Sequence, residues 1–171
     1  MAFLKKYRAS KAAFLGLLFA LSMILSLVES SLSSFIPVPG IKVGLSNIVT
    51  MYCLFCLGKE EALTITVLKS FFVLLTRGVT GAAMSFCGGM LSLGVMLALL
   101  YVKKAKLSYL FISICGGVAH NAGQLLMAGV LLRNTLVGYY FPILALSGIL
   151  MGIITGILLR YLMPHLNKIL R

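Results

Sequence analysis

Long apolar runs separated by short charged connections are the feature that most limits how this chain can fold. Of its 171 residues, 61% are apolar and 11% are charged. A membrane-spanning helix needs about 20 mainly apolar residues, so a chain of this length accommodates about six spans. Backbone groups in hydrocarbon must pair within their own segment, which makes each run a helix. The sequence therefore predicts an all-α integral membrane protein.

The expected fold is a single transmembrane domain, a bundle of six helices with both termini in the cytoplasm. Its spans follow the apolar runs and stop at proline, glycine or charged clusters, at residues 9–34, 43–57, 60–77, 80–102, 107–132 and 139–163. The second span is short. Treating it as a re-entrant loop would move the later KKAK run to the outside, so six full spans are preferred.

The charge balance supports this orientation. Fifteen Lys and Arg residues face three acids, and the net charge is +12. Six spans with an inside N-terminus place eleven cations on the cytoplasmic side, as the positive-inside rule requires: Lys5, Lys6, Arg8, Lys11, Lys59, Lys103, Lys104, Lys106, Arg160, Lys168 and Arg171. The prediction is a multi-pass protein of the cell membrane, with the lipid bilayer as a partner. Nucleic acid is not expected, because its binding needs an exposed basic face.

The other four cations gather toward the outer side. Lys42, Arg77 and Arg133 fall at outer ends of predicted spans, and Lys69 lies near the middle of its span. Glu29 is the only acid at this depth. Because one acid cannot neutralise four cations, the surplus favours an anionic ligand such as a carboxylate or phosphate. The alternative is a structural Glu29–Lys69 pair with Arg77 reaching toward the headgroups.

The stretch CGGVAHNAGQLLMA places polar groups inside an otherwise apolar span. His120 and Gln124 are four residues apart and share a helix face, with Asn121 beside them and Gly116 one turn earlier. Intramembrane polar residues are candidates for function, yet they also join helices by hydrogen bonds. Ligand binding and inter-helical contact both remain open for this motif.

The connection PVPGIKVGLSN, residues 37–47, forms a rigid turn leading into a helix start. Helix N-termini attract anions, and Lys42 adds charge there, with Asn47 close behind. The segment is therefore expected to act as a rim or lid over a binding site. Alternatively, its prolines and glycines only end one span and begin the next.

A stripe of small residues, Ala12, Gly16 and Ala20, marks the cytoplasmic half of the first span. Such stripes let helices approach closely, usually within one bundle. Because of its depth, this stripe could also dock a partner membrane subunit.

Several signatures of catalysis are missing. There is no GxxxxGK[ST] loop for ATP, no aspartate for a magnesium site and no metal-ligand spacing. Cys53 and Cys56 form a CxxC inside an apolar run, where two small hydrophobic residues are the simpler interpretation. We therefore expect that the chain is not an enzyme and that it binds no metal and no cofactor of its own.

Three stretches, IPVPGIKVGLSNIVT, SFCGGMLSLGVM and AHNAGQLLMA, resemble the bacterial membrane family labelled heptaprenyl diphosphate synthase component I, also called Gx transporter proteins. The resemblance covers about residues 27–162. That family is similar to the substrate-binding S-components of energy-coupling factor (ECF) importers. The likeness implies six helices, an outward-side pocket capped by the loop after the first helix, and cytoplasmic termini. It also implies docking, through small residues of the first helix, to a coupling subunit and to ATPases that hydrolyse ATP.

The preferred hypothesis is a substrate-binding subunit of an ECF-type importer for a small, anionic, partly apolar molecule, such as an isoprenoid or quinone precursor. By motif position, the resemblance assigns binding to Lys42, Asn47, His120, Asn121 and Gln124. The charge argument adds Glu29, Lys69 and Arg77. The alternative is a non-catalytic membrane accessory subunit of polyprenyl diphosphate or quinone synthesis, since the synthases themselves rely on Asp-rich motifs. A structural scaffold is the third hypothesis.

Overall fold

The computed structural model describes residues 2–33, 44–101, 107–133 and 135–169, and within these ranges every regular element is a helix. The predicted all-α fold is therefore confirmed. The elements in chain order are α1 (Ala2–Ser33), α2 (Asn47–Tyr52), the π-helical turn η1 (Cys53–Leu57), α3 (Lys59–Tyr101), α4 (Tyr109–Leu132), the 3₁₀ turn η2 (Thr135–Tyr140) and α5 (Phe141–Ile169).

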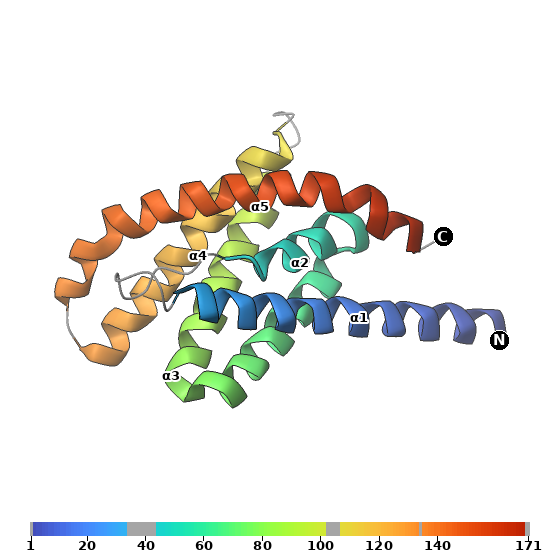
Figure 1. The fold of residues 1–171 in the computed structure, drawn as a ribbon, viewed down its shortest axis with the longest axis horizontal. Helices are drawn as coiled ribbons and strands as arrows, with labels where there is room; N and C mark the ends of the chain where they lie inside the picture. Colours follow the sequence, from blue (N-terminus) through green and yellow to red (C-terminus); the bar gives the residue numbers. More distant parts are fainter. Residues whose placement is uncertain (1, 34–43, 102–106, 134, 170–171) are drawn as a thin grey trace.

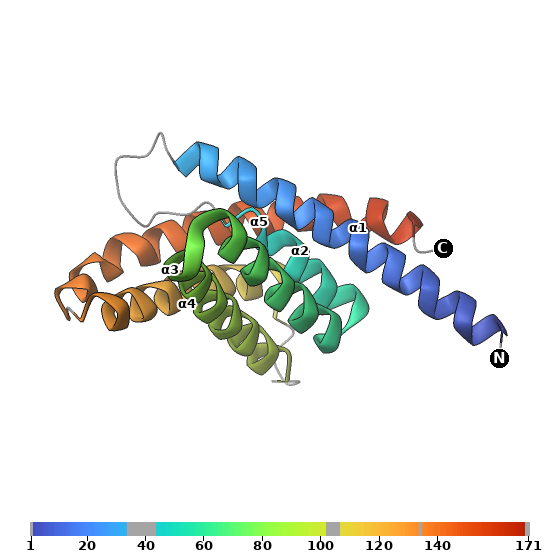
Figure 2. The same ribbon diagram turned by 90° about the horizontal axis from the view of Figure 1, so that it is seen from below.

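Helix α3 is two helices joined at a sharp bend. Its 43 residues would extend about 65 Å if straight, twice the thickness of the hydrocarbon layer. Gly78 breaks the helix, with φ 74° and ψ −173°, a conformation that glycine adopts without a Cβ penalty. Figures 1 and 2 show the two legs folding back on each other at this point. Gly78 lies in the connection that the sequence analysis places between residues 77 and 80.

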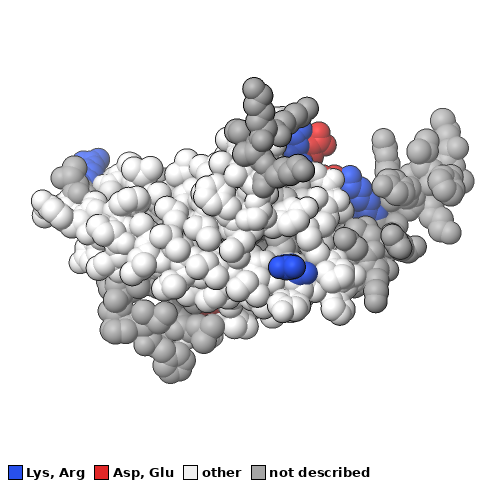
Figure 3. All heavy atoms as spheres, turned by 90° about the horizontal axis from the view of Figure 1, so that it is seen from above, with Lys and Arg blue, Asp and Glu red and all other residues white. Residues whose placement is uncertain are grey.

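The described helices have the length and composition of a multi-pass membrane protein. Four are long and apolar enough to cross a bilayer, and the apolar helix Asn47–Leu57 is shorter. The start of α1 and the end of α5 lie at the same end of the bundle (Figure 1). Large apolar side chains face outward, with Leu75 and Val130 each 71% exposed, and much of the face in Figure 3 carries no charge. The membrane location is confirmed, while the six-span count and the cytoplasmic side of the termini stay predictions.

The short helix α2 lies inside the bundle. Five of its six residues are buried, and Tyr52 and Cys53 at its end are completely enclosed. The π turn that follows is closed by a 2.8 Å hydrogen bond from the Gly58 amide to the Cys53 carbonyl. Cys53 is thus a buried, unoxidised core residue, and Cys56 is a half-buried free thiol.

Helices α4 and α5 approach so closely that only glycine fits between their backbones. A Cβ on Gly152 would lie 2.5 Å from Cα of Ile114, and one on Gly117 would lie 2.5 Å from the carbonyl oxygen of Gly148. Both distances are shorter than real Cβ contacts, so a larger residue must push the helices apart. Gly148 and Gly152 of α5 therefore form a packing surface within this bundle.

We predict that Gly152→Ala lowers stability by about 1–3 kcal/mol, because overpacking strains both helices. Gly94→Ala is the matched control. A Cβ on Gly94 meets nothing within 4 Å, and alanine favours helix over glycine, so its melting temperature should be unchanged or slightly higher. Thermal unfolding in detergent measures both. Equal melting temperatures for the two variants would contradict the close contact.

Candidate functional site

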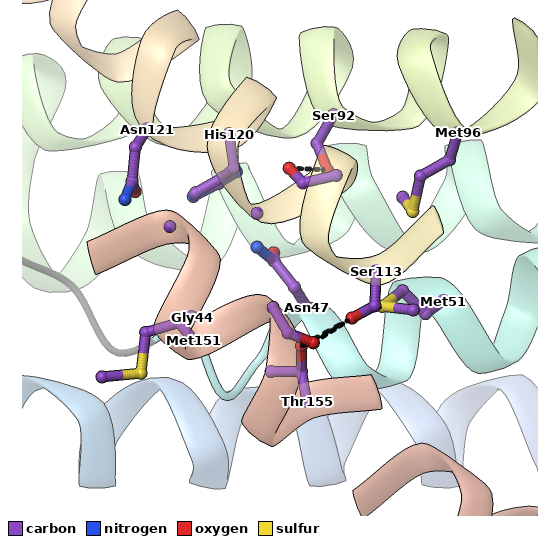
Figure 4. A pocket seen from close by; sticks show the side chains of 14 residues that line it. Gly44, Asn47, Met51, Ser92, Met96, Ser113, His120, Asn121, Met151 and Thr155 are labelled. Carbon is purple, nitrogen blue, oxygen red and sulfur yellow. Dashed lines mark hydrogen bonds between the residues drawn. The ribbon is translucent and has the colours of Figure 1, made fainter. Parts of the chain in front are cut away.

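The most polar part of the interior surrounds two small neighbouring cavities. The first, about 20 Å³, lies between α2, the second leg of α3, α4 and α5. The second, about 10 Å³, lies between α2 and the two legs of α3. Asn47, Ser92 and Met96 line both. The first has room for one water molecule and the second is at the lower limit for one, so neither accommodates a larger ligand in this conformation. Figure 4 shows the first cavity, with Asn47 near its centre.

Lys69 points into the bundle and not toward lipid. It is 7% exposed, and its ammonium group donates a 2.7 Å hydrogen bond to Oδ1 of Asn47. Thr50, Thr66 and Ser85 line the same cavity. A lysine in hydrocarbon is costly unless it meets polar groups or water. The sequence-predicted residues Lys69 and Asn47 are therefore brought together at one cavity.

His120 and Gln124 form a buried pair on α4. Each is 4% exposed, and Nε2 of His120 lies 2.7 Å from Nε2 of Gln124. The two side chains are within hydrogen-bond distance of each other. His120 lines the first cavity. The predicted shared face of these two residues is confirmed.

Asn121 joins two helices. Its amide nitrogen donates a 2.8 Å hydrogen bond to the carbonyl oxygen of Leu144 on α5, and it also borders the first cavity. For Asn121, the structure therefore contains the inter-helical hydrogen bond that the sequence analysis gave as the alternative to ligand binding. Its role toward a ligand stays a prediction.

Glu29 and Arg77 make contacts outside the two cavities. The Glu29 carboxylate is 4% exposed and accepts from the Gly44 amide at 2.7 Å and from the Ser46 hydroxyl at 3.2 Å. Glu29 thereby fastens α1 to the start of α2, and Gly44 in turn lines the first cavity. Arg77 donates to the carbonyl oxygen of Ser26 at 3.4 Å. Both residues position α1 beside the site, and neither lines a cavity.

Lys42, which the sequence places at the rim, lies outside the described residues.

Sequence reasoning missed three hydroxyl groups of the first cavity. Ser113 donates to the Gly152 carbonyl oxygen at 2.6 Å and lies 2.9 Å from the Thr155 hydroxyl. Ser92 donates to the carbonyl oxygen of Gly116 at 2.8 Å. One signal was present, because Ser113 is seven residues before His120 and so shares its helix face. The contacts with α3 and α5 depend on tertiary packing and leave no local pattern.

The predicted docking stripe lies on the outer surface of α1. Ala12 and Gly16 are exposed and Ala20 is half-buried, and a Cβ on Gly16 would meet nothing within 4 Å. Packing within this bundle therefore does not require a small residue at position 16.

The described residues contain no group of three or more His, Cys, Asp or Glu side chains placed to hold a metal ion. Figure 4 shows instead hydroxyl, amide and imidazole groups around the cavity. Such a set can hydrogen-bond to a ligand, and Lys69 beside it can contact a negative charge.

Comparisons with curated proteins and with solved structures give no match. The family described as heptaprenyl diphosphate synthase component I matches residues 18–162, which is most of the chain and includes every described residue around the two cavities. Its description names a component and not a complete synthase, in line with the expectation that the chain is not itself an enzyme. The resemblance noted in the sequence is thus confirmed, and the chain belongs to the heptaprenyl diphosphate synthase component I family.

Proposed function

We propose that this chain is a substrate-binding membrane subunit that holds a small anionic molecule inside its bundle, as S-components of ECF importers do. The observation that carries the proposal is the buried Lys69, bonded to Asn47 at the wall of a polar cavity. Hydrogen-bonding groups on α4 lie at the adjoining cavity, where they can orient the same ligand. Catalysis has no part in this proposal.

The charge of the region supports an anionic ligand. Among the three acids, Glu61 pairs with Lys11 between α3 and α1, and Glu60 is exposed at the start of α3. Glu29 is then the remaining acid for both Lys69 and Arg77. These three side chains together carry a net charge of +1. A carboxylate or phosphate would balance that excess, and its bonds to the lysine would be charge-assisted.

A ligand larger than water requires the two cavities to merge. Asn47, Ser92 and Met96 line both cavities and so lie between them. Methionine has three rotatable bonds and adapts readily to new shapes, so Met96 is suited to move aside. An anion could then contact Lys69 and Asn47, while His120 binds the other end of the molecule.

Transport would also require partners. The exposed stripe Ala12, Gly16 and Ala20 on α1 is the proposed docking surface for an ECF coupling subunit, with ATP hydrolysed by associated ATPases. The absence of a large side chain at Gly16 leaves space for a second helix to approach.

The first prediction of this proposal concerns a co-purified ligand. Native mass spectrometry of gently purified protein should detect a bound small molecule. Lys69→Met should lower its occupancy by about tenfold or more, since hydrogen bonds to charged groups contribute about 1.5–3 kcal/mol. His120→Ala should also lower it. Lys59→Met is the control, because Lys59 is exposed at the start of α3.

A ligand retained equally in Lys69→Met and Lys59→Met would contradict the proposed site. Thermal unfolding is measured in parallel, so that a variant that has lost its fold is not counted as one that has lost its ligand.

The second prediction concerns docking. Gly16→Leu should weaken co-purification with an ECF coupling subunit by roughly fivefold or more, because overpacking a close contact costs about 1–3 kcal/mol. Ligand occupancy should not change. Gly94→Leu is the matched control, since Gly94 is also an exposed helical glycine with nothing near its Cβ. If both variants co-purify equally with the coupling subunit, the proposal that α1 is the docking surface is wrong.

A second candidate function is a non-catalytic membrane accessory subunit of polyprenyl diphosphate synthesis. The family description favours it, and so does a groove of about 690 Å³ between the start of α4 and the later half of α5. Leu107, Tyr109 and Met163 line the groove, with the exposed Arg160 among them. By the charge rule this end faces the cytoplasm, where a soluble synthase subunit could bind.

For this candidate, Arg160→Gln should weaken binding of a prenyl diphosphate synthase subunit in a pull-down by about 1.4- to fivefold, the range for an exposed ion pair of about 0.2–1 kcal/mol. Arg133→Gln, an exposed cation at the other end of α4, should have no effect. If no synthase subunit binds the unmodified protein, the accessory function is refuted.

A further inference from the structure

A second groove opens at the other end of α4. It has a volume of about 340 Å³ and lies between the second leg of α3, the end of α4, η2 and the start of α5. Its walls are mainly apolar, with Met84 and Leu125 among them. Leu132 and Tyr140, which line it as well, are 68% and 49% exposed, so the groove opens on the lipid-facing surface of the bundle.

The groove borders the buried polar motif of α4. Gln124 is 4% exposed, lines the groove and pairs with His120 at 2.7 Å. Leu144 lines the same groove, and its carbonyl oxygen accepts the hydrogen bond of Asn121. An apolar groove with a buried amide on its wall differs from a lipid-facing surface that is apolar throughout.

A row of polar groups leads from this groove to the buried lysine. Gln124 contacts His120, and His120 and Asn47 line the first cavity together. Asn47 in turn accepts the hydrogen bond of Lys69 at the second cavity. The groove, the two cavities and the lysine thus follow one another across the bundle.

We propose that the groove admits and holds a single-chain amphipathic anion, whose apolar chain lies along the groove while its acidic head passes Gln124 and His120 toward Lys69. The inference rests on the proposed function, because it takes Lys69 as the site of the anion, and it adds the place of the apolar chain and the route of entry. The ligand enters laterally from the bilayer.

Two observations favour this occupant. The apolar walls match a hydrocarbon chain, and the buried ammonium group of Lys69 at the end of the polar row matches an acidic head. The groove's volume is near the lower end of the range for small-molecule sites, which suits one chain better than the two chains of a phospholipid. A phospholipid head also belongs at the membrane surface, whereas this row of polar groups leads into the bundle.

The absence of tryptophan from the chain allows a direct test. Met84→Trp places a single fluorophore in the groove, and Leu132→Trp places one at its rim in case the first variant folds poorly. Each is reconstituted in phosphatidylcholine nanodiscs and titrated with farnesyl diphosphate, farnesol or inorganic diphosphate. Leu75→Trp, on the lipid-facing surface of α3, is the control.

Farnesyl diphosphate should give a saturable change in tryptophan emission in the groove variants and none in the control. Farnesol and inorganic diphosphate should bind at least tenfold more weakly, because each lacks one half of the ligand. Adding Gln124→Leu or Lys69→Met to a groove variant should also weaken the response to farnesyl diphosphate at least tenfold.

Four results would overturn the inference. One is an equal response of the control, which indicates partition into the bilayer. Another is the same change on exchange into phosphatidylglycerol nanodiscs alone, which indicates a two-chain lipid. The third is no groove response while native mass spectrometry still finds a Lys69-dependent ligand, which leaves the proposed function intact. Conversely, a groove response insensitive to Lys69→Met would refute the anion site at Lys69.

Discussion

The hydrogen bond between Lys69 and Asn47 is the contact on which the interior depends. A lysine at mid-span cannot face hydrocarbon without large cost, so the first leg of α3 must turn this face inward. Asn47 on α2 accepts the hydrogen bond of this lysine. Helix α2 is too short to cross a bilayer, and five of its six residues are buried. Holding α2 in the centre requires α1 as well, and Glu29 supplies that attachment through Gly44 and Ser46.

Glycines set the size of the space around this contact. A Cβ on Gly116 would lie 2.9 Å from the sulfur of Met96, and one on Gly88 would lie 2.8 Å from the His120 carbonyl oxygen. The helices therefore close until the cavities hold little more than water. Lys69, Asn121 and Gln124 already form hydrogen bonds in this state, so a ligand that contacts them must exchange existing hydrogen bonds for its own. Binding should then favour ligands that carry both a charge and a chain, since burial of the chain adds free energy.

The sequence predicted the features that follow from helical periodicity and from the free-energy cost of placing polar groups in hydrocarbon. Helical structure and the shared face of His120 and Gln124 both have this origin. The bonds of Glu29 to the start of α2, and of Asn121 to a carbonyl of α5, could not be predicted. Each joins elements distant in sequence, and backbone partners carry no residue-type signal. The same applies to Ser113, whose partners lie on another helix.

The two proposed functions differ mainly in which end of α4 meets the substrate. Capture of an anion uses the groove beside Gln124, which borders the polar cavities. An accessory role uses the groove beside Arg160, whose lining does not include any of the interior polar residues. Both grooves are apolar enough for an isoprenoid chain, so the family description alone does not choose between them. The buried row from Gln124 to Lys69 does favour one, because holding a synthase subunit at the surface gives no reason to maintain a costly cation in the centre of the bundle.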